Sequence, residues 1–296
     1  MSATPTAPRS EAPRADAFQP SPDLNGAIAR EYRRERRLRT RDLLLAIATP
    51  IVLMACWEVA ARGGLLDARL FTPPSKIVER AAQMIADGEL WGHIEATSAR
   101  LLAGFVIGSV LGIIAGLAMG VWRPVRAALG PTFTALYALP KIAILPLLLL
   151  IFGLTETPKV LAVVISVFFV VQINTLAGIV QIDARILEAA RAYKATGWRL
   201  FRYILLPAAT PAIMTGLRVS AGMSVIVITA VEFVASNDGL GYLIWNSWQL
   251  FQPQDMYVGL ITVSLLGAVL TGLIILFERA LLPWRRPGGS HRKVKK

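Results

Sequence analysis

The sequence is poor in the residue types on which soluble enzymes and metal proteins depend. Only 17% of its 296 residues are charged, and it contains one cysteine and two histidines. The lone Cys56 excludes a disulfide framework within the chain, and His93 and His291 lie far apart without neighbours spaced for metal binding. Hydrophobic residues make up 55% of the chain, and its mean hydropathy is +0.55. This composition is too apolar for a soluble domain and indicates a polytopic membrane protein.

Motifs for phosphate binding and for nucleophilic catalysis are missing as well. No stretch matches G-x-x-x-x-G-K-[ST], and no glycine directly precedes a lysine. Neither histidine has the sequence context of a Ser-His-Asp or Cys-His set. We therefore expect a chain that is not an enzyme and that binds no cofactor or metal itself.

Six apolar stretches are long enough to cross a bilayer, which takes roughly 20 mostly apolar residues. They are residues 43–61, 101–122, 131–152, 160–181, 212–235 and 258–282. We predict an all-α fold with a six-helix transmembrane domain at residues 43–284. A disordered basic tail, residues 1–42, precedes it, and the Arg-rich part of this tail is suited to lie as a helix on anionic lipid. A second basic tail, residues 285–296, follows it.

Lysine and arginine are unevenly distributed around these stretches. Of 31 such residues, 24 fall in or next to the two tails and the even-numbered loops, six fall in the first and third loops, and Lys141 lies inside the third stretch. None lies between Val219 and Glu278. Positive charge is concentrated in cytoplasmic loops. We therefore predict that both termini and the loop at residues 183–211 are cytoplasmic in a bacterial inner membrane. Membrane orientation also accounts for the net charge of +12 without nucleic-acid binding.

The second and third stretches carry small and helix-breaking residues. Glycine recurs at every fourth position of the second stretch, a pattern that lets another helix approach closely. These glycines are Gly104, Gly108, Gly112, Gly116 and Gly120. The third stretch contains Pro131, Pro140 and Pro146, which favour a broken helix that faces protein or a water-filled path.

Charged and polar side chains inside the spans are candidates for a translocation path, since a charge there costs about 2.5–3.5 kcal/mol on insertion scales. Lys141 is suited to attract an anion, or to snorkel or pair with another helix. Glu232 is suited to contact a solute, or to brace Lys141 or a neighbouring helix, and we favour bracing. Gln172 and Asn174 are suited to line the path or to form hydrogen bonds between helices.

The loop at residues 183–211 is amphipathic, basic and closed by proline. Glu188 is followed by Ala189 and Ala190, and Leu206 precedes Pro207, which lies nineteen residues after the glutamate. This pattern resembles the EAA loop that membrane subunits of bacterial ATP-binding-cassette importers present to their ATPase partner.

One position of the loop departs from that motif. The usual glycine, six residues after the glutamate, is Lys194 here, and the nearest glycine is Gly197, where we expect the bend. The alternative interpretation of the loop is an ordinary amphipathic helix at the membrane surface.

Several further motifs, in order along residues 43–284, resemble permeases of the nitrate, sulfonate and taurine importer family. They are FTPPSKIV, LPKIAILPLLLLIFG, INTLAGIVQID and SNDGLGYLI. The resemblance implies a type I importer permease fold with a second permease copy, ATPase subunits that hold ATP and Mg, and a periplasmic binding protein that delivers the solute. From the resemblance we expect a small anionic solute of the nitrate, sulfonate or taurine class, with a thiamine-precursor pyrimidine or an aromatic carboxylate as the alternative. An ion-coupled secondary carrier is a weaker alternative, because the sequence has no evident inverted repeat.

Overall fold

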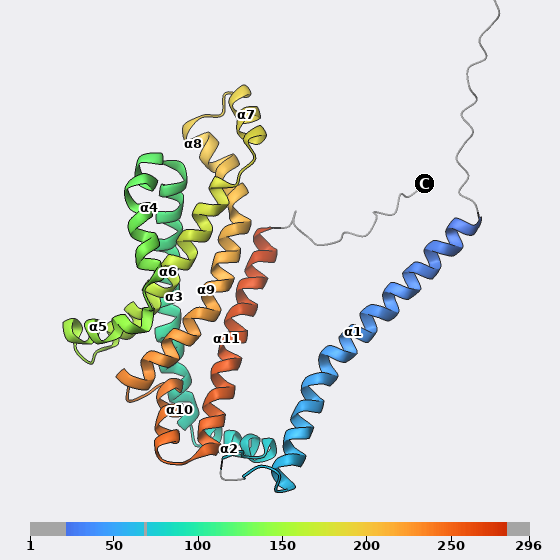
Figure 1. Ribbon diagram of the computed structural model, residues 1–296, viewed down its shortest axis with the longest axis vertical. Helices are drawn as coiled ribbons and strands as arrows, with labels where there is room; N and C mark the ends of the chain where they lie inside the picture. Colours follow the sequence, from blue (N-terminus) through green and yellow to red (C-terminus); the bar gives the residue numbers. More distant parts are fainter. Residues whose placement is uncertain (1–21, 68–69, 283–296) are drawn as a thin grey trace, which may run out of the picture. The chain divides into compact units, whose positions relative to one another are not determined.

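A computed structural model describes residues 22–67 and 70–282, and it shows only helices and connecting turns in these two ranges (Figure 1). The all-α prediction is confirmed for them. The predicted tail at residues 285–296 and the first half of the predicted tail at residues 1–42 lie outside the described residues. The chain divides into two units, at residues 1–60 and 61–296, which we describe separately.

The first unit contains most of α1 (Pro22–Arg62), a helix of 41 residues. Its apolar part, from Thr40 onward, is long enough to span a membrane and includes the first predicted span. Residues 22–42 are helical too, so the predicted disorder does not hold for residues 22–28, whereas the Arg-rich part that follows is helical as expected. The segment contains seven arginines, and arginine is a good helix former. It continues directly into an apolar helix, so no new nucleation step is needed.

The second unit is a helix bundle. Its α-helices are α2 (Pro74–Ala86), α3 (Glu89–Val121), α4 (Arg123–Ala138), α5 (Leu145–Phe152), α6 (Glu156–Val180), α7 (Ala184–Ala192), α8 (Gly197–Leu200), α9 (Leu206–Ala235), α10 (Leu240–Gln249) and α11 (Pro253–Leu281). A 3-10 turn, Lys141–Ile144, precedes α5, and a π-helical turn, Phe201–Leu205, joins α8 to α9. Helices α7 and α8 lie at one end of the bundle, here the α7 end, and α2 and α10 lie at the other, here the α10 end (Figure 1).

The third predicted span is a bent pair of helices. Helix α4 begins at Arg123, and its axis makes an angle of 93° with the helical run that follows Pro140. The break occurs here because proline disfavours a helical conformation for the residue before it, and Leu139 is extended, with φ −67° and ψ 135°. The prolines therefore predict the break correctly. Five other helices in the described ranges are long and apolar enough to span, and the bent pair makes the sixth candidate.

Helices α3, α6 and α9 form the core of the bundle. Val163, Val167 and Val171 of α6 and Ile228 and Val231 of α9 are completely buried. The valines recur at every fourth position, so one face of α6 presents a continuous row of branched side chains to its neighbours.

The glycine row of α3 lies directly against α6, as the sequence predicts. A Cβ atom added to Gly104 would lie 2.6 Å from Cβ of Val163, and one added to Gly116 would lie 2.5 Å from Cβ of Thr175. The three other glycines of the row leave equally little room beside α6. The absence of side chains therefore allows the two backbones to approach along four helical turns.

Candidate functional site

The 183–211 loop begins with α7, whose start is fixed by Asp183. This residue is the N-cap of the helix, and its Oδ1 accepts a hydrogen bond of 2.9 Å from the backbone N–H of Arg185. Glu188 and Ala189 are exposed on the helix, whereas Ala190 is buried. The carboxylate of Glu188 is therefore available to a partner.

A Schellman motif ends α7, and Lys194 occupies its left-handed position. The backbone N–H of Lys194 donates to the carbonyl of Arg191, and that of Ala195 donates to the carbonyl of Ala190, both at 2.9 Å. Lys194 has a φ of 57°, a conformation that glycine adopts without strain and lysine does not. The chain thus bends at the motif's usual glycine position even though that residue is lysine.

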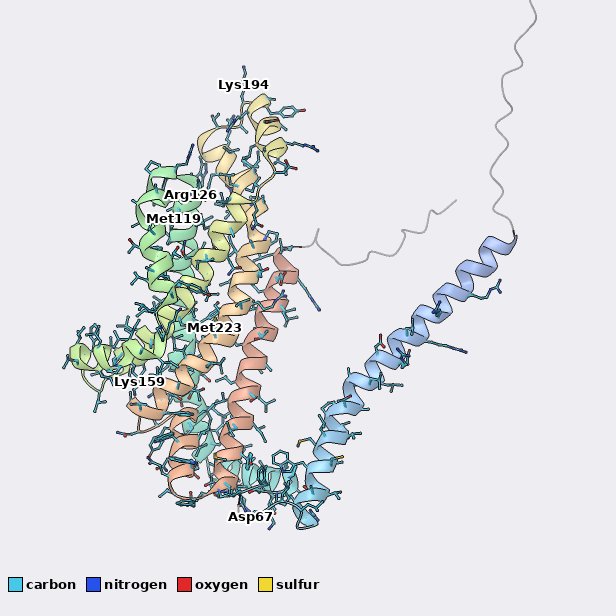
Figure 2. The ribbon with its side chains drawn as sticks, viewed as in Figure 1. Asp67, Met119, Arg126, Lys159, Lys194 and Met223 are labelled. Atoms are coloured by element: carbon cyan, nitrogen blue, oxygen red, sulfur yellow. The ribbon has the colours of Figure 1, made fainter. Side chains whose placement is uncertain are left out.

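Gly197 provides a second bend, with a φ of 55°. The bend expected there is therefore present, but it follows the one at Lys194. Figure 2 shows Lys194 at the tip of the α7 end. The two left-handed residues enclose a short turn that reverses the chain toward α8.

The second half of the loop is continuous with a membrane helix. From Trp198 to Leu206 the sequence predicts a short helix that ends at Pro207, but the helix continues: α8, the π-helical turn and α9 form one helical passage, Gly197–Ala235. Pro207 directly follows the π-helical turn Phe201–Leu205, and its missing N–H leaves one helical hydrogen bond of this passage unmade. Displacement of the loop would therefore act on α9 through helix rather than through a flexible linker.

Aromatic and basic side chains cover the outside of the 183–211 loop. Tyr193, Trp198 and Tyr203 are 88%, 71% and 74% exposed. Four arginines of the loop, Arg185, Arg191, Arg199 and Arg202, are exposed as well. Exposed aromatic rings beside arginine are typical of surfaces that bind another protein.

At the α10 end, a cluster of ionic side chains is built around Arg100 of α3, which is 4% exposed. Its Nε and Nη2 donate to the two carboxylate oxygens of Glu156 at 2.5 and 2.9 Å. Its Nη1 donates to Oε1 of Glu232 at 2.9 Å and to the carbonyl of Asp238 at 3.3 Å, and its Nη2 also donates to Oδ1 of Asp238 at 2.5 Å. These contacts use all five N–H groups of the guanidinium.

Glu232 of α9 is completely buried, and it braces a neighbouring helix as expected, although its cation is Arg100 and not Lys141. Its carboxylate also accepts hydrogen bonds from Oγ1 of Thr97 and, at 2.9 Å, from the backbone N–H of Gly241. A buried carboxylate is stable only when it is paired and hydrogen-bonded in this way. Glu232 is therefore fully engaged by protein groups.

The glycines of the SNDGLGYLI motif leave room for that carboxylate. A Cβ on Gly239 would lie 2.5 Å from Oε1 of Glu232, and Gly239 also has a φ of 97°. A Cβ on Gly241 would lie 2.5 Å from the carbonyl of Thr229 and 2.7 Å from Cβ of Glu232. The two glycines and Glu232 thus form one structural unit.

Arg100 and Lys159 belong to this cluster, although their sequence positions do not predict it. Lys159 is 4% exposed, and its Nζ donates to Glu156 at 2.8 Å and to Ser236 at 3.2 Å. Both cations lie one residue before a predicted span, a position typical of a loop charge. The signal that could have found them is the single acidic residue inside the fifth span, because a buried Glu232 requires a cation.

The other candidates for the translocation path have local partners. Lys141, at the break between α4 and α5, donates to the carbonyl of Tyr137 and lies 4.3 Å from the centre of its ring. Gln172 is 1% exposed and faces Met119 of α3. Asn174 is half-buried and donates to a carbonyl of its own helix. Their role in a path stays a prediction.

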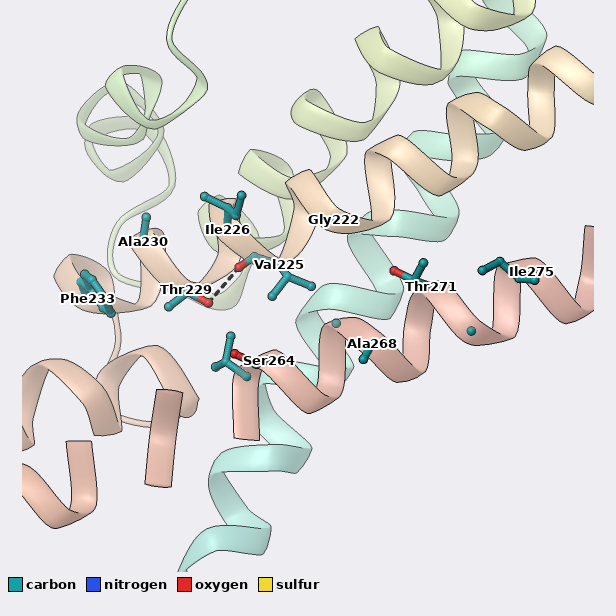
Figure 3. A pocket seen from close by; sticks show the side chains of 13 residues that line it. Gly222, Val225, Ile226, Thr229, Ala230, Phe233, Ser264, Ala268, Thr271 and Ile275 are labelled. Atoms are coloured by element: carbon teal, nitrogen blue, oxygen red, sulfur yellow. Dashed lines mark hydrogen bonds between the residues drawn. The ribbon is translucent and has the colours of Figure 1, made fainter. Parts of the chain in front are cut away.

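A groove of about 780 Å³ runs between α9 and α11 (Figure 3). Glycines, among them Gly222 and Gly267, and aliphatic side chains form most of its lining. The hydroxyls of Thr229 and Ser264 donate to carbonyls four residues earlier in their own helices, each at 2.8 Å. With these hydroxyls turned back to the backbone, the groove resembles a helix-packing or lipid-facing surface more than a site for an anion.

Comparison with known proteins supports the resemblance noted above. The chain is 32% identical over 273 residues to an aliphatic sulfonates transport permease protein, SsuC, of Bacillus subtilis, which covers 92% of this chain and 98% of the relative. It is 28% identical to the taurine transport system permease protein TauC of Escherichia coli, over 87% of this chain and 97% of the relative.

The fold agrees with the sequence comparison. An amino acid ABC transporter with histidines matches at a TM-score of 0.55 and 19% identity, over 67% of this chain and 97% of that one. The prediction of an importer permease fold is thereby confirmed. Residues 108–286 match the model of a family described as the binding-protein-dependent transport system inner membrane component, and the chain belongs to that family.

Proposed function

We propose that this permease forms half of the translocation path of an ATP-driven importer and couples to separate ATPase subunits through the 183–211 loop. The observation that carries the proposal is the construction of the loop. Glu188 is exposed on α7, two left-handed residues turn the chain, and an unbroken helical passage leads from Gly197 into the membrane. Such a loop can receive a push from a partner and pass it to a membrane helix.

The energy for transport then comes from the partner. The ATPase subunits bind ATP and Mg, and their closure displaces α7, with the exposed Tyr193 and Trp198 as apolar contacts. Displacement of the loop tilts α9 and opens the path at one side of the membrane while closing it at the other. In this arrangement the α7 end is cytoplasmic and the α10 end faces the periplasm.

The solute class follows from the relatives and from charge. The two permeases reported above carry names that refer to aliphatic sulfonates and taurine, both of which contain a sulfonate group. We propose a small sulfonate as the solute, delivered by a periplasmic binding protein, with a second copy of the permease completing the path. Lys141, beside the broken span, is the cation suited to attract it.

Affinity purification with a charge reversal tests the coupling. Wild-type permease carrying a C-terminal tag is extracted from its native membrane in mild detergent, and co-purifying proteins are identified by mass spectrometry. We expect an ATPase that is lost from the Glu188→Lys variant. The matched control is Glu79→Lys, the same change at an exposed position of α2 at the α10 end, which should retain the ATPase. Absence of an ATPase from the wild-type preparation, or its retention by the Glu188→Lys variant, would overturn the proposal.

Uptake in whole cells tests the solute. Cells that express the complete importer should accumulate a labelled aliphatic sulfonate, and unlabelled taurine or alkane sulfonate should compete. Competition only by an aromatic carboxylate or by a pyrimidine would replace the sulfonate assignment while leaving the importer intact. Uptake that persists without ATP and collapses with the ion gradient would instead support a secondary carrier.

A further inference from the structure

The first turn of α10 is held by side chains from two other helices. The backbone N–H of Gly239 donates to Nδ1 of His93 at 3.1 Å, and that of Leu240 donates to Oγ1 of Thr97 at 2.7 Å. The N–H of Gly241 donates to Glu232. The first N–H groups of a helix have no partner within it, so three consecutive donors are satisfied here from α3 and α9.

Thr97 connects the cap to the buried charges. Its hydroxyl oxygen accepts from Leu240 while its hydrogen is directed at the Glu232 carboxylate. Glu232 in turn pairs with Arg100. We call these three residues, Thr97, Arg100 and Glu232, the α10 anchor. It joins α3, α9 and α10 by hydrogen bonds that are shielded from water, and such bonds are strong and directional.

The Glu232 carboxylate also lies at the N-terminus of α10, the helix that it caps. Its Oε2 lies 2.9 Å from the backbone nitrogen of Gly241, in the first turn of α10. A negative charge at a helix N-terminus is favourable because it opposes the positive end of the helix dipole. With Arg100 on its other side, Glu232 is held from both directions and has little freedom to move.

Helix α9 connects the α10 anchor to the 183–211 loop. It is 30 residues long, about 45 Å at 1.5 Å per residue. It begins at Leu206, within the loop, and ends at Ala235, three residues after Glu232. Four residues, Ser236 to Gly239, then separate α9 from α10, which begins at Leu240. Without a clamp, so short a connection containing a residue with positive φ would act as a hinge.

We propose that Thr97, Arg100 and Glu232 are positioning residues that clamp this hinge, so that α10 and α9 move as one body during the transport cycle. The inference rests on the proposed function, in which α9 transmits movement between the 183–211 loop and the periplasmic end. Movement of α9 then displaces α10 where the binding protein releases its solute. In the reverse direction, a binding protein that presses on α10 signals its presence to the ATPase.

The variant Thr97→Val tests this inference, because it keeps the shape of the side chain but removes its hydroxyl. Two measurements are made on the reconstituted complex of permease, ATPase and binding protein. Hydrogen exchange of peptides covering residues 236–245 reports on the clamp. ATP hydrolysis with and without solute-loaded binding protein reports on signalling. The control is Thr262→Val on α11, whose hydroxyl donates to a carbonyl of its own helix.

We expect exchange at Leu240 to accelerate at least tenfold in the Thr97→Val complex. Stimulation of ATP hydrolysis by the binding protein should fall at least fivefold, while basal hydrolysis and recovery of the ATPase stay at the wild-type level. The Thr262→Val complex should behave as wild type in every respect. Restoring a hydroxyl with Thr97→Ser should recover more than half of the lost stimulation.

Two results would overturn the inference. Faster exchange at Leu240 with undiminished stimulation would show that the clamp is only structural, and unchanged exchange would show that Thr97 does not hold α10. A wild-type permease that recovers no ATPase would contradict the proposed function instead, and the exchange measurement on the permease alone would then decide whether the α10 anchor holds the helix.

Discussion

The two ends of the bundle are held by different kinds of interaction. At the α7 end, backbone hydrogen bonds fix the left-handed turn at Lys194, Gly197 makes a second left-handed bend, and three aromatic side chains are exposed. At the α10 end, Arg100 of α3 is bound by groups from α6, α9 and the connection between α9 and α10, and every donor of its guanidinium has a partner. The first end is built as a surface for a partner and the second as a joint within the chain. Helix α9 links them.

The largest expected difference in stability between substitutions at the two ends comes from removal of Arg100. Arg100→Met leaves Glu232 buried without its cation, which should destabilise the permease by about 3–5 kcal/mol. Arg218→Met breaks an exposed pair with Glu278 toward the α7 end and should cost less than about 1 kcal/mol. Unfolding midpoints of the purified proteins in detergent, together with their amounts in the membrane, measure both effects.

A double substitution separates the lost ion pair from lost packing. Arg100→Met combined with Glu232→Met removes both charges, so it should recover a large part of the stability that the single substitution loses. If Arg100→Met proved no more harmful than Arg218→Met, the two ends would not differ as the structure indicates.

A smaller loss is expected from Gly241→Ala at the α10 end. The new methyl group would lie 2.5 Å from the carbonyl of Thr229, in the backbone of α9, and neither helix can move without disturbing the α10 anchor. We expect a cost of about 1–3 kcal/mol, as for other overpacked sites. Gly222→Ala, in open space on α9, is the control and should be neutral or slightly stabilising in thermal unfolding. Equal midpoints for the two variants would contradict the tight packing at Gly241.

At the α7 end, one substitution should raise stability. Lys194→Gly removes the strain of a left-handed lysine, which is on the order of 1 kcal/mol, and it also restores the usual residue of the motif. Recovery of the ATPase should be unchanged, because the bend is already formed. Lys194→Val, which is branched at Cβ, should lower the unfolding midpoint. A midpoint that falls with glycine would mean that the lysine side chain itself stabilises the loop.

The sequence predicts most of the fold because its signals are local. Glycine spacing indicates that another helix packs closely on α3, and the structure shows that this helix is α6. Pro140 indicates the break after α4. The left-handed turn at Lys194 could not be read locally, because lysine has no preference for that conformation and hydrogen bonds within the folded loop impose it.

The cluster of ionic side chains around Arg100 could not be predicted from the sequence, for a different reason. Arg100 and Lys159 lie at the margins of apolar stretches, where a cation ordinarily faces water or lipid headgroups. Their burial depends on α3, α6 and α9 coming together around Glu232, which is a property of the folded bundle. Composition and periodicity do not indicate which distant parts of the chain pack together. The isolated acid in the fifth span, Glu232, does imply that a cation lies beside it in the fold.

The smallest expected effect is the pH dependence of stability that comes from Asp238, the exposed carboxylate bound to Arg100. Asp238 lies between α9 and α10, and the hydrogen bond from Arg100 holds the pKa of its carboxyl below the ordinary value of 3.8, although partial burial opposes this shift. A depressed pKa stabilises the fold at every pH above the ordinary value, and this contribution disappears only as the pH falls through the folded-state pKa. Asp238→Asn removes the charge at all pH values.

The difference in unfolding midpoint between the wild type and Asp238→Asn should therefore be constant from about pH 7 to about pH 5 and shrink only below about pH 4, where the wild-type carboxylate takes up its proton. Thermal unfolding of both proteins over that range measures it. The shift should be small, since the Asp238 side chain is 59% exposed and solvent screens the pair. A difference that vanishes already near pH 6 would mean that Arg100 does not hold Asp238, and that the ionic joint at the α10 end consists of Glu156 and Glu232 alone.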